Sequence, residues 1–170
     1  LISAGIALDV NAITTPVFPL TQSVGKNLLK LYLNDVGLLT DVLYGSNIRA
    51  ILDDEAGINP GSVYESVVAQ ELAAHGFKLF YYDNRSKGEV DYLIDDYDSL
   101  SAVPIEVKSG KDYTIHSALS AFVKNEDYHV KKAFVLSNAR EIRTDGKITY
   151  LPIYDVMFLG TEVKDGVPRN

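Results

Sequence analysis

The sequence predicts an α/β fold in which a mixed β-sheet is flanked by helices. Three strand-like segments follow one another after residue 76 and are joined by short polar turns, which predicts an antiparallel meander. A strand, a helix and a further strand then alternate between residues 101 and 138. Such a unit forms a right-handed crossover between parallel strands, because a twisted strand and its helix pack together with that hand. Antiparallel and parallel pairs together make the sheet mixed.

The first part of the chain lacks a clear period and is expected to be an irregular or helical extension. Residues 1–27 contain Pro16 and Pro19 and are expected to be a connector from a missing upstream region. Residues 30–35, KLYLND, alternate as a strand does, and Asp35 is expected to cap a short helix. We therefore place the start of the folded domain near residue 28.

The clearest helix is expected over residues 61–76, GSVYESVVAQELAAHG. Ser62 followed three residues later by Glu65 is a capping-box pattern, in which both side chains bind backbone N–H groups at the helix start. Gly76 is expected to end the helix, because glycine adopts the left-handed conformation without a steric penalty. The later elements are expected as strands at 77–83, 89–96 and 101–109, a helix at 114–126, strands at 131–138 and from 146, and a polar tail at 161–170.

Composition limits the classes of function. The chain has 170 residues, no cysteine and a net charge of −7. Disulfides and thiolate metal sites are therefore excluded, and a reducing cytoplasm is the expected location. No apolar run reaches the roughly 18 residues that span a membrane, so no membrane partner is expected. The negative charge counts against tight, non-specific binding of nucleic acid, which needs a basic surface.

Charged residues inside two strand-like segments form the candidate site. Asp91 lies within EVDYLI, and Glu106 and Lys108 lie within PIEVKSG. Residues two apart on a strand share a face, so Glu106 and Lys108 are expected to project together, with Asp91 beside them on the neighbouring strand. Two carboxylates suit Mg²⁺ or Mn²⁺, a nearby lysine can assist an attacking water, and Glu65 on the preceding helix can supply a third carboxylate.

A purely structural interpretation of the same residues stays open. Glu106 and Lys108 can form an ion pair on one face of a strand, while Asp91 accepts a backbone hydrogen bond. Glu65 can serve only as a member of the capping box. The three histidines of the chain show no zinc-binding spacing.

The candidate residues resemble the PD-(D/E)xK nuclease superfamily, which has the restriction-endonuclease-like fold. The helix acid of that pattern falls on Glu65, the metal-binding aspartate on Asp91, and the E-x-K element on Glu106 and Lys108. The resemblance implies that the three carboxylates bind metal and that all four residues are catalytic. The sequence departs from the pattern at Val90, where the motif has proline.

A second resemblance covers residues 28–160. The segments KLYLNDVGLL, GSVYESVVAQEL, YYDNRSKGEVDYLI and PIEVKSG look like the C-terminal domain of unknown function of predicted prokaryotic AAA-type ATPases. The resemblance implies an ATPase domain in cis before residue 1, and ATP is expected to bind only there because the chain has no G-x-x-x-x-G-K-[ST] motif. The expected division is a connector at 1–27, a PD-(D/E)xK-like domain at 28–160 and a tail at 161–170.

Two functions of different classes follow. The first is metal-dependent hydrolysis of phosphodiester bonds in DNA or RNA. The second is a non-catalytic module that binds nucleic acid or protein, or regulates the ATPase. The acid–acid–lysine set favours the first function, and the net charge of −7 favours the second.

Overall fold

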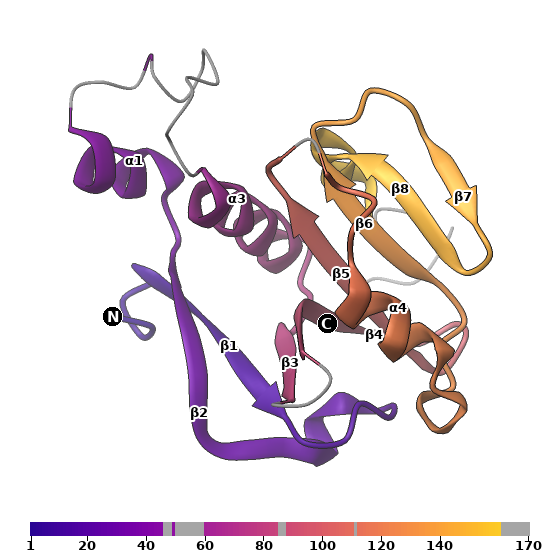
Figure 1. Ribbon diagram of the computed structural model, residues 1–170. Helices are drawn as coiled ribbons and strands as arrows, with labels where there is room; N and C mark the ends of the chain where they lie inside the picture. Colours follow the sequence, from indigo (N-terminus) through magenta and orange to yellow (C-terminus); the bar gives the residue numbers. More distant parts are fainter. Residues whose placement is uncertain (46–48, 50–59, 85–87, 111, 161–170) are drawn as a thin grey trace, which may run out of the picture.

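A computed structural model describes residues 1–45, 49, 60–84, 88–110 and 112–160 (Figure 1). Within these residues the strands form one eight-stranded sheet in the order β2-β1-β3-β4-β5-β6-β8-β7. The strands are β1 (Ala7–Ile13), β2 (Val24–Leu33), β3 (Phe80–Asn84), β4 (Gly88–Asp96), β5 (Ser101–Lys108), β6 (Ala133–Ser137), β7 (Arg143–Asp145) and β8 (Ile148–Pro152). The α-helices are α1 (Val36–Tyr44), α3 (Gly61–Ala74) and α4 (Ser117–Lys124), and the 3-10 helices are η1 (Leu20–Ser23), η2 (Glu126–Tyr128) and η3 (Ile153–Phe158).

The mixed α/β architecture is confirmed. Strands β3, β4 and β5 form the predicted antiparallel meander. Strands β5 and β6 are parallel and are connected through α4, as the crossover predicts. Helix α4 is shorter than the expected 114–126, and the expected tail at 161–170 lies outside the described residues.

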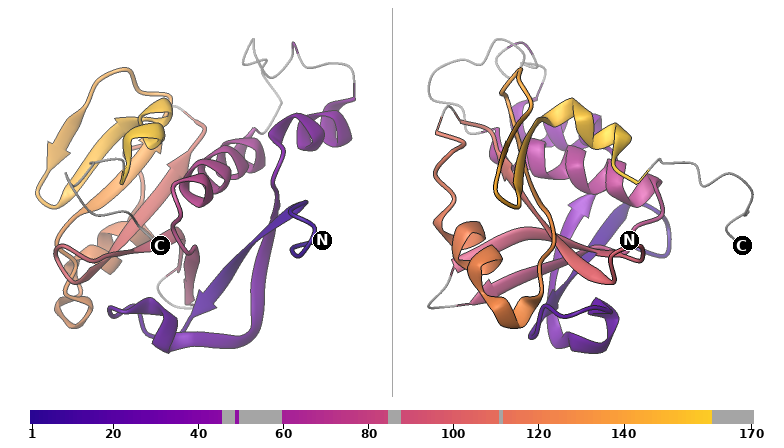
Figure 2. Two further views of the ribbon diagram at one scale, coloured as in Figure 1. Left: turned by 180° about the vertical axis from the view of Figure 1, so that it is seen from behind. Right: turned by 90° about the vertical axis from the view of Figure 1, so that its right-hand side faces the viewer.

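Helices cover both faces of the sheet (Figure 2). Helix α3 and η3 pack on one face, where Val68 and Leu72 join Val103, Ile105 and Val107 of β5 in one apolar cluster. Helix α4 packs on the other face, where its buried side chains join a second cluster that includes Ala102 of β5. Strand β5 therefore alternates between two buried faces, which is why it is apolar almost throughout.

The expectation of an irregular connector at 1–27 is wrong for two stretches. Residues 7–13 form β1, and residues 24–27 belong to β2. Strand β1 pairs antiparallel with β2 and parallel with β3, so the N-terminal hairpin extends the main sheet. The predicted cap of the following helix is confirmed, since Asp35 accepts a hydrogen bond from the Leu38 N–H at 3.0 Å.

The predicted capping box is also wrong. Helix α3 begins at Gly61, directly after Pro60, and has no side-chain hydrogen bond at its N-cap. Ser62 therefore lies inside the helix, and the Glu65 carboxylate accepts from Tyr32 instead. The other end agrees with the sequence, because Gly76 follows the helix with a φ of 83°.

None of the helices in the described part of the chain has the length and apolar character needed to cross a membrane.

Candidate functional site

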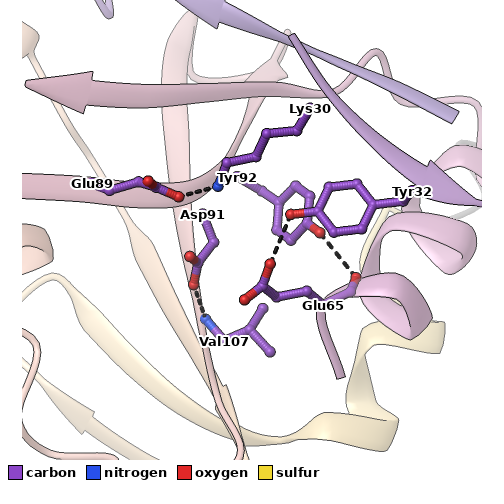
Figure 3. A network of polar contacts seen from close by, with 7 residues as sticks. All are labelled: Lys30, Tyr32, Glu65, Glu89, Asp91, Tyr92 and Val107. Atoms are coloured by element: carbon purple, nitrogen blue, oxygen red, sulfur yellow. Dashed lines mark hydrogen bonds and ion pairs between the residues drawn. The ribbon is translucent and has the colours of Figure 1, made fainter. Parts of the chain in front are cut away.

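The site lies where strands β4 and β5 stop pairing. Their ladder runs from Asp96↔Ser101 to Tyr92↔Ile105, and Asp91 and Glu106 are the next residue on each strand. The Asp91 side chain reaches across this point, and its Oδ2 accepts a hydrogen bond from the Val107 N–H at 2.8 Å (Figure 3). The pairing register thus brings Asp91 to the E-x-K segment.

An irregularity in β4 sets the direction of Asp91. Phe80 pairs with Leu93 and Tyr82 pairs with Val90, so β4 holds one more residue than β3 between these pairs. Val90 consequently packs in the cluster on the α4 side, although Tyr92, two residues later, packs in the cluster on the α3 side. Such bulges redirect side chains and are frequent beside active sites. Asp91 lies in this bulge, between the two faces.

Glu106 and Lys108 lie on the face of β5 opposite to the one that packs against α3. Their ion pair joins Glu106 Oε1 to Lys108 Nζ at 2.6 Å. The Glu106 residue is only 5% exposed, and its Oε2 is buried without a hydrogen-bond partner among the described residues. Gln70 Oε1 on α3 shares this lack of a partner. Since a buried, unpaired carboxylate oxygen is costly, Glu106 has capacity for one more ligand.

Glu65 approaches the site from α3. Its Oε2 accepts from the Tyr32 hydroxyl at 2.8 Å, and its backbone carbonyl accepts from the Tyr92 hydroxyl at 2.9 Å. Figure 3 shows the Glu65 carboxylate directed toward Asp91. The structure therefore brings all four predicted residues to one region, with Glu65 on the α3 side and Glu106 and Lys108 on the α4 side.

Burial and mutual repulsion govern the charges of this region. Burial, followed by the negative charge of Glu106, raises the pKa of Asp91 to about 7, although the Val107 N–H acts in the opposite direction. Burial also raises the pKa of Glu106, against the opposing effect of Lys108. Burial alone would lower the pKa of Lys108, but the hydrogen bond and charge of Glu106 outweigh it and raise that pKa. Such shifts concentrate at functional sites.

The donor set fits a hard divalent cation that keeps part of its water shell. Within the described residues no group of three or more acidic or histidine side chains is close enough to hold a metal ion. Mg²⁺ usually takes only one or two carboxylates, together with waters and substrate phosphate. Asp91 and the unpaired oxygen of Glu106 match this smaller requirement. The Glu65 carboxylate is directed toward Asp91 from the α3 side.

Sequence reasoning missed two residues of β2 that border the site. Tyr32 contacts Glu65, and Lys30 forms an ion pair with Glu89 and lies over the Tyr81 ring at 4.8 Å from its centroid. The alternation in KLYL places Lys30 and Tyr32 on one face, which was the available signal. Their proximity to the site depends on the position of the hairpin in the sheet, which the local pattern does not contain.

The family model described as Domain of unknown function (DUF4143) matches residues 60–156, more than half of the chain. The chain belongs to the DUF4143 family. This agrees with the resemblance to a domain of unknown function that the sequence motifs show. No curated protein matches the chain.

The matched DUF4143 segment runs from the start of α3 into η3. It contains Glu65, Asp91, Glu106 and Lys108. It leaves out β1, β2 and α1, so Tyr32 and Lys30 reach the site from outside the matched segment.

Proposed function

We propose that this DUF4143 domain is a metal-dependent nuclease that hydrolyses phosphodiester bonds in DNA or RNA. Asp91 and Glu106 would hold Mg²⁺ or Mn²⁺, with Glu65 in support. When bound, such an ion polarises the phosphate and lowers the pKa of a coordinated water. The element order α3-β3-β4-β5-α4-β6 supports a PD-(D/E)xK-like, restriction-endonuclease-like domain. The sequence segments that resemble the C-terminal domain of predicted AAA-type ATPases, such as KLYLNDVGLL and PIEVKSG, support an ATPase domain of that type as its partner in cis.

One observation carries the proposal: the buried Oε2 of Glu106, which has no hydrogen-bond partner among the described residues. An ion pair with a structural role alone would be expected to satisfy both oxygens of so buried a carboxylate. Here Lys108 satisfies only Oε1. Asp91 is likewise held by a single described hydrogen bond, from Val107. A cation would supply the partner that the Glu106 Oε2 lacks and would offset the repulsion between Glu106 and Asp91.

Lys108 is suited to act on the substrate side of the site. Its side chain is 32% exposed, so the ammonium group contacts solvent while it is anchored by Glu106. The raised pKa keeps the group protonated at neutral pH. A fixed positive charge there stabilises the negative charge that develops on the phosphate oxygens during hydrolysis.

A second candidate function is a non-catalytic module that binds nucleic acid or protein, or regulates the ATPase. The net charge of −7 favours the protein-binding or regulatory form of this module, because nucleic acid is repelled at long range. The contacts of Asp91 with Val107 and of Glu106 with Lys108 are also those that a structural role requires.

Cleavage assays separate the two functions. We expect the full chain to cleave at least one of single-stranded DNA, double-stranded DNA and RNA when Mg²⁺ or Mn²⁺ is added, and not in EDTA. Asp91→Ala and Lys108→Ala should each reduce the rate by about 100-fold or more. Lys132→Ala is the matched control, since Lys132 pairs with Asp96 at the other end of β4. Failure of all substrates across a metal titration would favour the non-catalytic module.

A further inference from the structure

Two tyrosines from different strands hold Glu65. Tyr32 of β2 is 9% exposed and donates its hydroxyl to the Glu65 carboxylate. Tyr92 of β4 is fully buried and donates its hydroxyl to the backbone carbonyl of the same residue. The two rings pack together, with centroids 5.7 Å apart (Figure 3). Glu65 is therefore restrained at its carboxylate and at its backbone.

The Tyr32 hydroxyl acts as a neutral donor. A phenol has an ordinary pKa of about 10, so it is protonated at neutral pH. The hydroxyl thus keeps its proton, and the hydrogen bond fixes one oxygen of the Glu65 carboxylate. A carboxylate on a long side chain loses considerable freedom when it becomes a metal ligand, so a partner that fixes it beforehand lowers this cost.

We propose that Tyr32 is a positioning residue that orients Glu65 toward Asp91, so that the β1–β2 hairpin is an integral part of the metal site. The inference rests on the proposed function and extends the site beyond the segment that the DUF4143 model matches. It also assigns a role to the hydrogen bond that takes the place of the expected capping box.

The contact differs from an ordinary buried tyrosine contact in its acceptor. Tyr82 offers a comparison on the opposite face of the sheet, where its hydroxyl lies 2.9 Å from that of Tyr128. The hydroxyls of Tyr32 and Tyr82 are both part-buried, but of these two only the Tyr32 hydroxyl binds a side chain of the candidate site. Loss of the Tyr82 hydroxyl therefore controls for the general effect of removing such a group.

Binding of Mn²⁺, measured by electron paramagnetic resonance, tests the inference without any need for activity. We expect wild-type protein to bind Mn²⁺, and Asp91→Asn to lose the bound ion, which identifies its site. Tyr32→Phe keeps the ring packing and should weaken binding about tenfold or more. Tyr82→Phe should leave the affinity unchanged, and thermal melting should show both phenylalanine variants folded.

A double-mutant cycle gives a readout that a structural role would not move. If Tyr32 acts through Glu65, Tyr32→Phe should have no further effect on Mn²⁺ affinity in a Glu65→Gln background. Equal Mn²⁺ affinity of wild type and Tyr32→Phe, or additive effects in the cycle, would overturn the inference and leave the proposed function intact. Absence of Mn²⁺ binding to the wild type would overturn both.

Discussion

Strand β4 carries acidic side chains at both ends of its pairing with β5. At the end that faces the turn after residue 96, Asp95 accepts from the Leu20 N–H at 3.0 Å. Asp96 accepts from the Ser99 hydroxyl at 2.6 Å and from the Asp98 N–H at 3.1 Å, and Lys132 pairs with it at 3.0 Å. At the opposite end, Asp91 has one described hydrogen bond, from the Val107 N–H, and its neighbour Glu106 leaves one oxygen unpaired.

Asp96 and Asp91 differ in the direction of their pKa shifts. Burial acts to raise the pKa of Asp96, but hydrogen bonds from Ser99 and Lys132 outweigh burial and lower it. Burial and the charge of Glu106 raise the pKa of Asp91 to about 7. Protein donors thus stabilise the Asp96 carboxylate at one end, whereas the other end holds two carboxylates that repel each other. Only the second arrangement gains from the arrival of a cation.

The largest expected difference between the ends is in metal-dependent cleavage. Glu106→Gln removes the charge of the carboxylate whose Oε2 has no described hydrogen-bond partner and should lower the cleavage rate about 1,000-fold, as removal of a central catalytic charge commonly does. Asp96→Asn, at the other end of the β4–β5 pairing, should leave the rate within about threefold of wild type, because its partners there are protein groups. Rates on one oligonucleotide in Mg²⁺ provide the measurement. Equal losses in both variants would remove the functional distinction.

The second expected difference is in stability, where the two ends should respond with opposite signs. Asp91→Asn relieves repulsion with Glu106 and should raise the free energy of unfolding at pH 7 by about 2 kcal/mol in the absence of metal. Asp96→Asn weakens charged hydrogen bonds and should lower it by about 1 kcal/mol. Urea denaturation in EDTA measures both. A destabilised Asp91→Asn variant would show that the Asp91 carboxylate has a structural role.

The third expected difference is in the pH dependence of stability in EDTA. The pKa of Asp91 is raised from 3.8 to about 7 in the folded chain, so the unfolded chain releases this proton first as the pH rises. The free energy of unfolding should therefore fall between about pH 4 and pH 7, on the order of 4 kcal/mol, since each unit of pKa shift contributes about 1.4 kcal/mol. The fall should be smaller in Asp91→Asn, with Glu106 supplying the remainder through its own raised pKa. The lowered pKa of Asp96 acts in another window, since its stabilisation is lost only as the pH drops below about 4.

Urea denaturation of wild type and Asp91→Asn at pH 4.5, 5.5, 6.5 and 7.5 measures this slope. A wild-type slope of the opposite sign, or identical slopes in both proteins, would contradict the assigned environment of Asp91.

Local patterns of the sequence determined much of the central fold. The short turns between three strand-like segments predicted the β3-β4-β5 meander, and the strand–helix–strand spacing predicted the parallel β5–β6 pair. The two-residue period of β5 was enough to place Glu106 and Lys108 together. These features follow from neighbours in the chain, because strand alternation and tight turns act over only a few residues.

Only the tertiary structure decided how the site is completed. The bulge that redirects Asp91 arises from the register between β3 and β4, and the contact of Tyr32 with Glu65 arises from the place of β2 in the sheet. The capping-box pattern at Ser62 and Glu65 gave a wrong expectation. The Glu65 carboxylate accepts a hydrogen bond from Tyr32, which is distant in the sequence, and the start of the helix has no side-chain cap. Register and strand order depend on pairing and burial between segments far apart in the chain, and a local hydrophobic period carries no information about those partners.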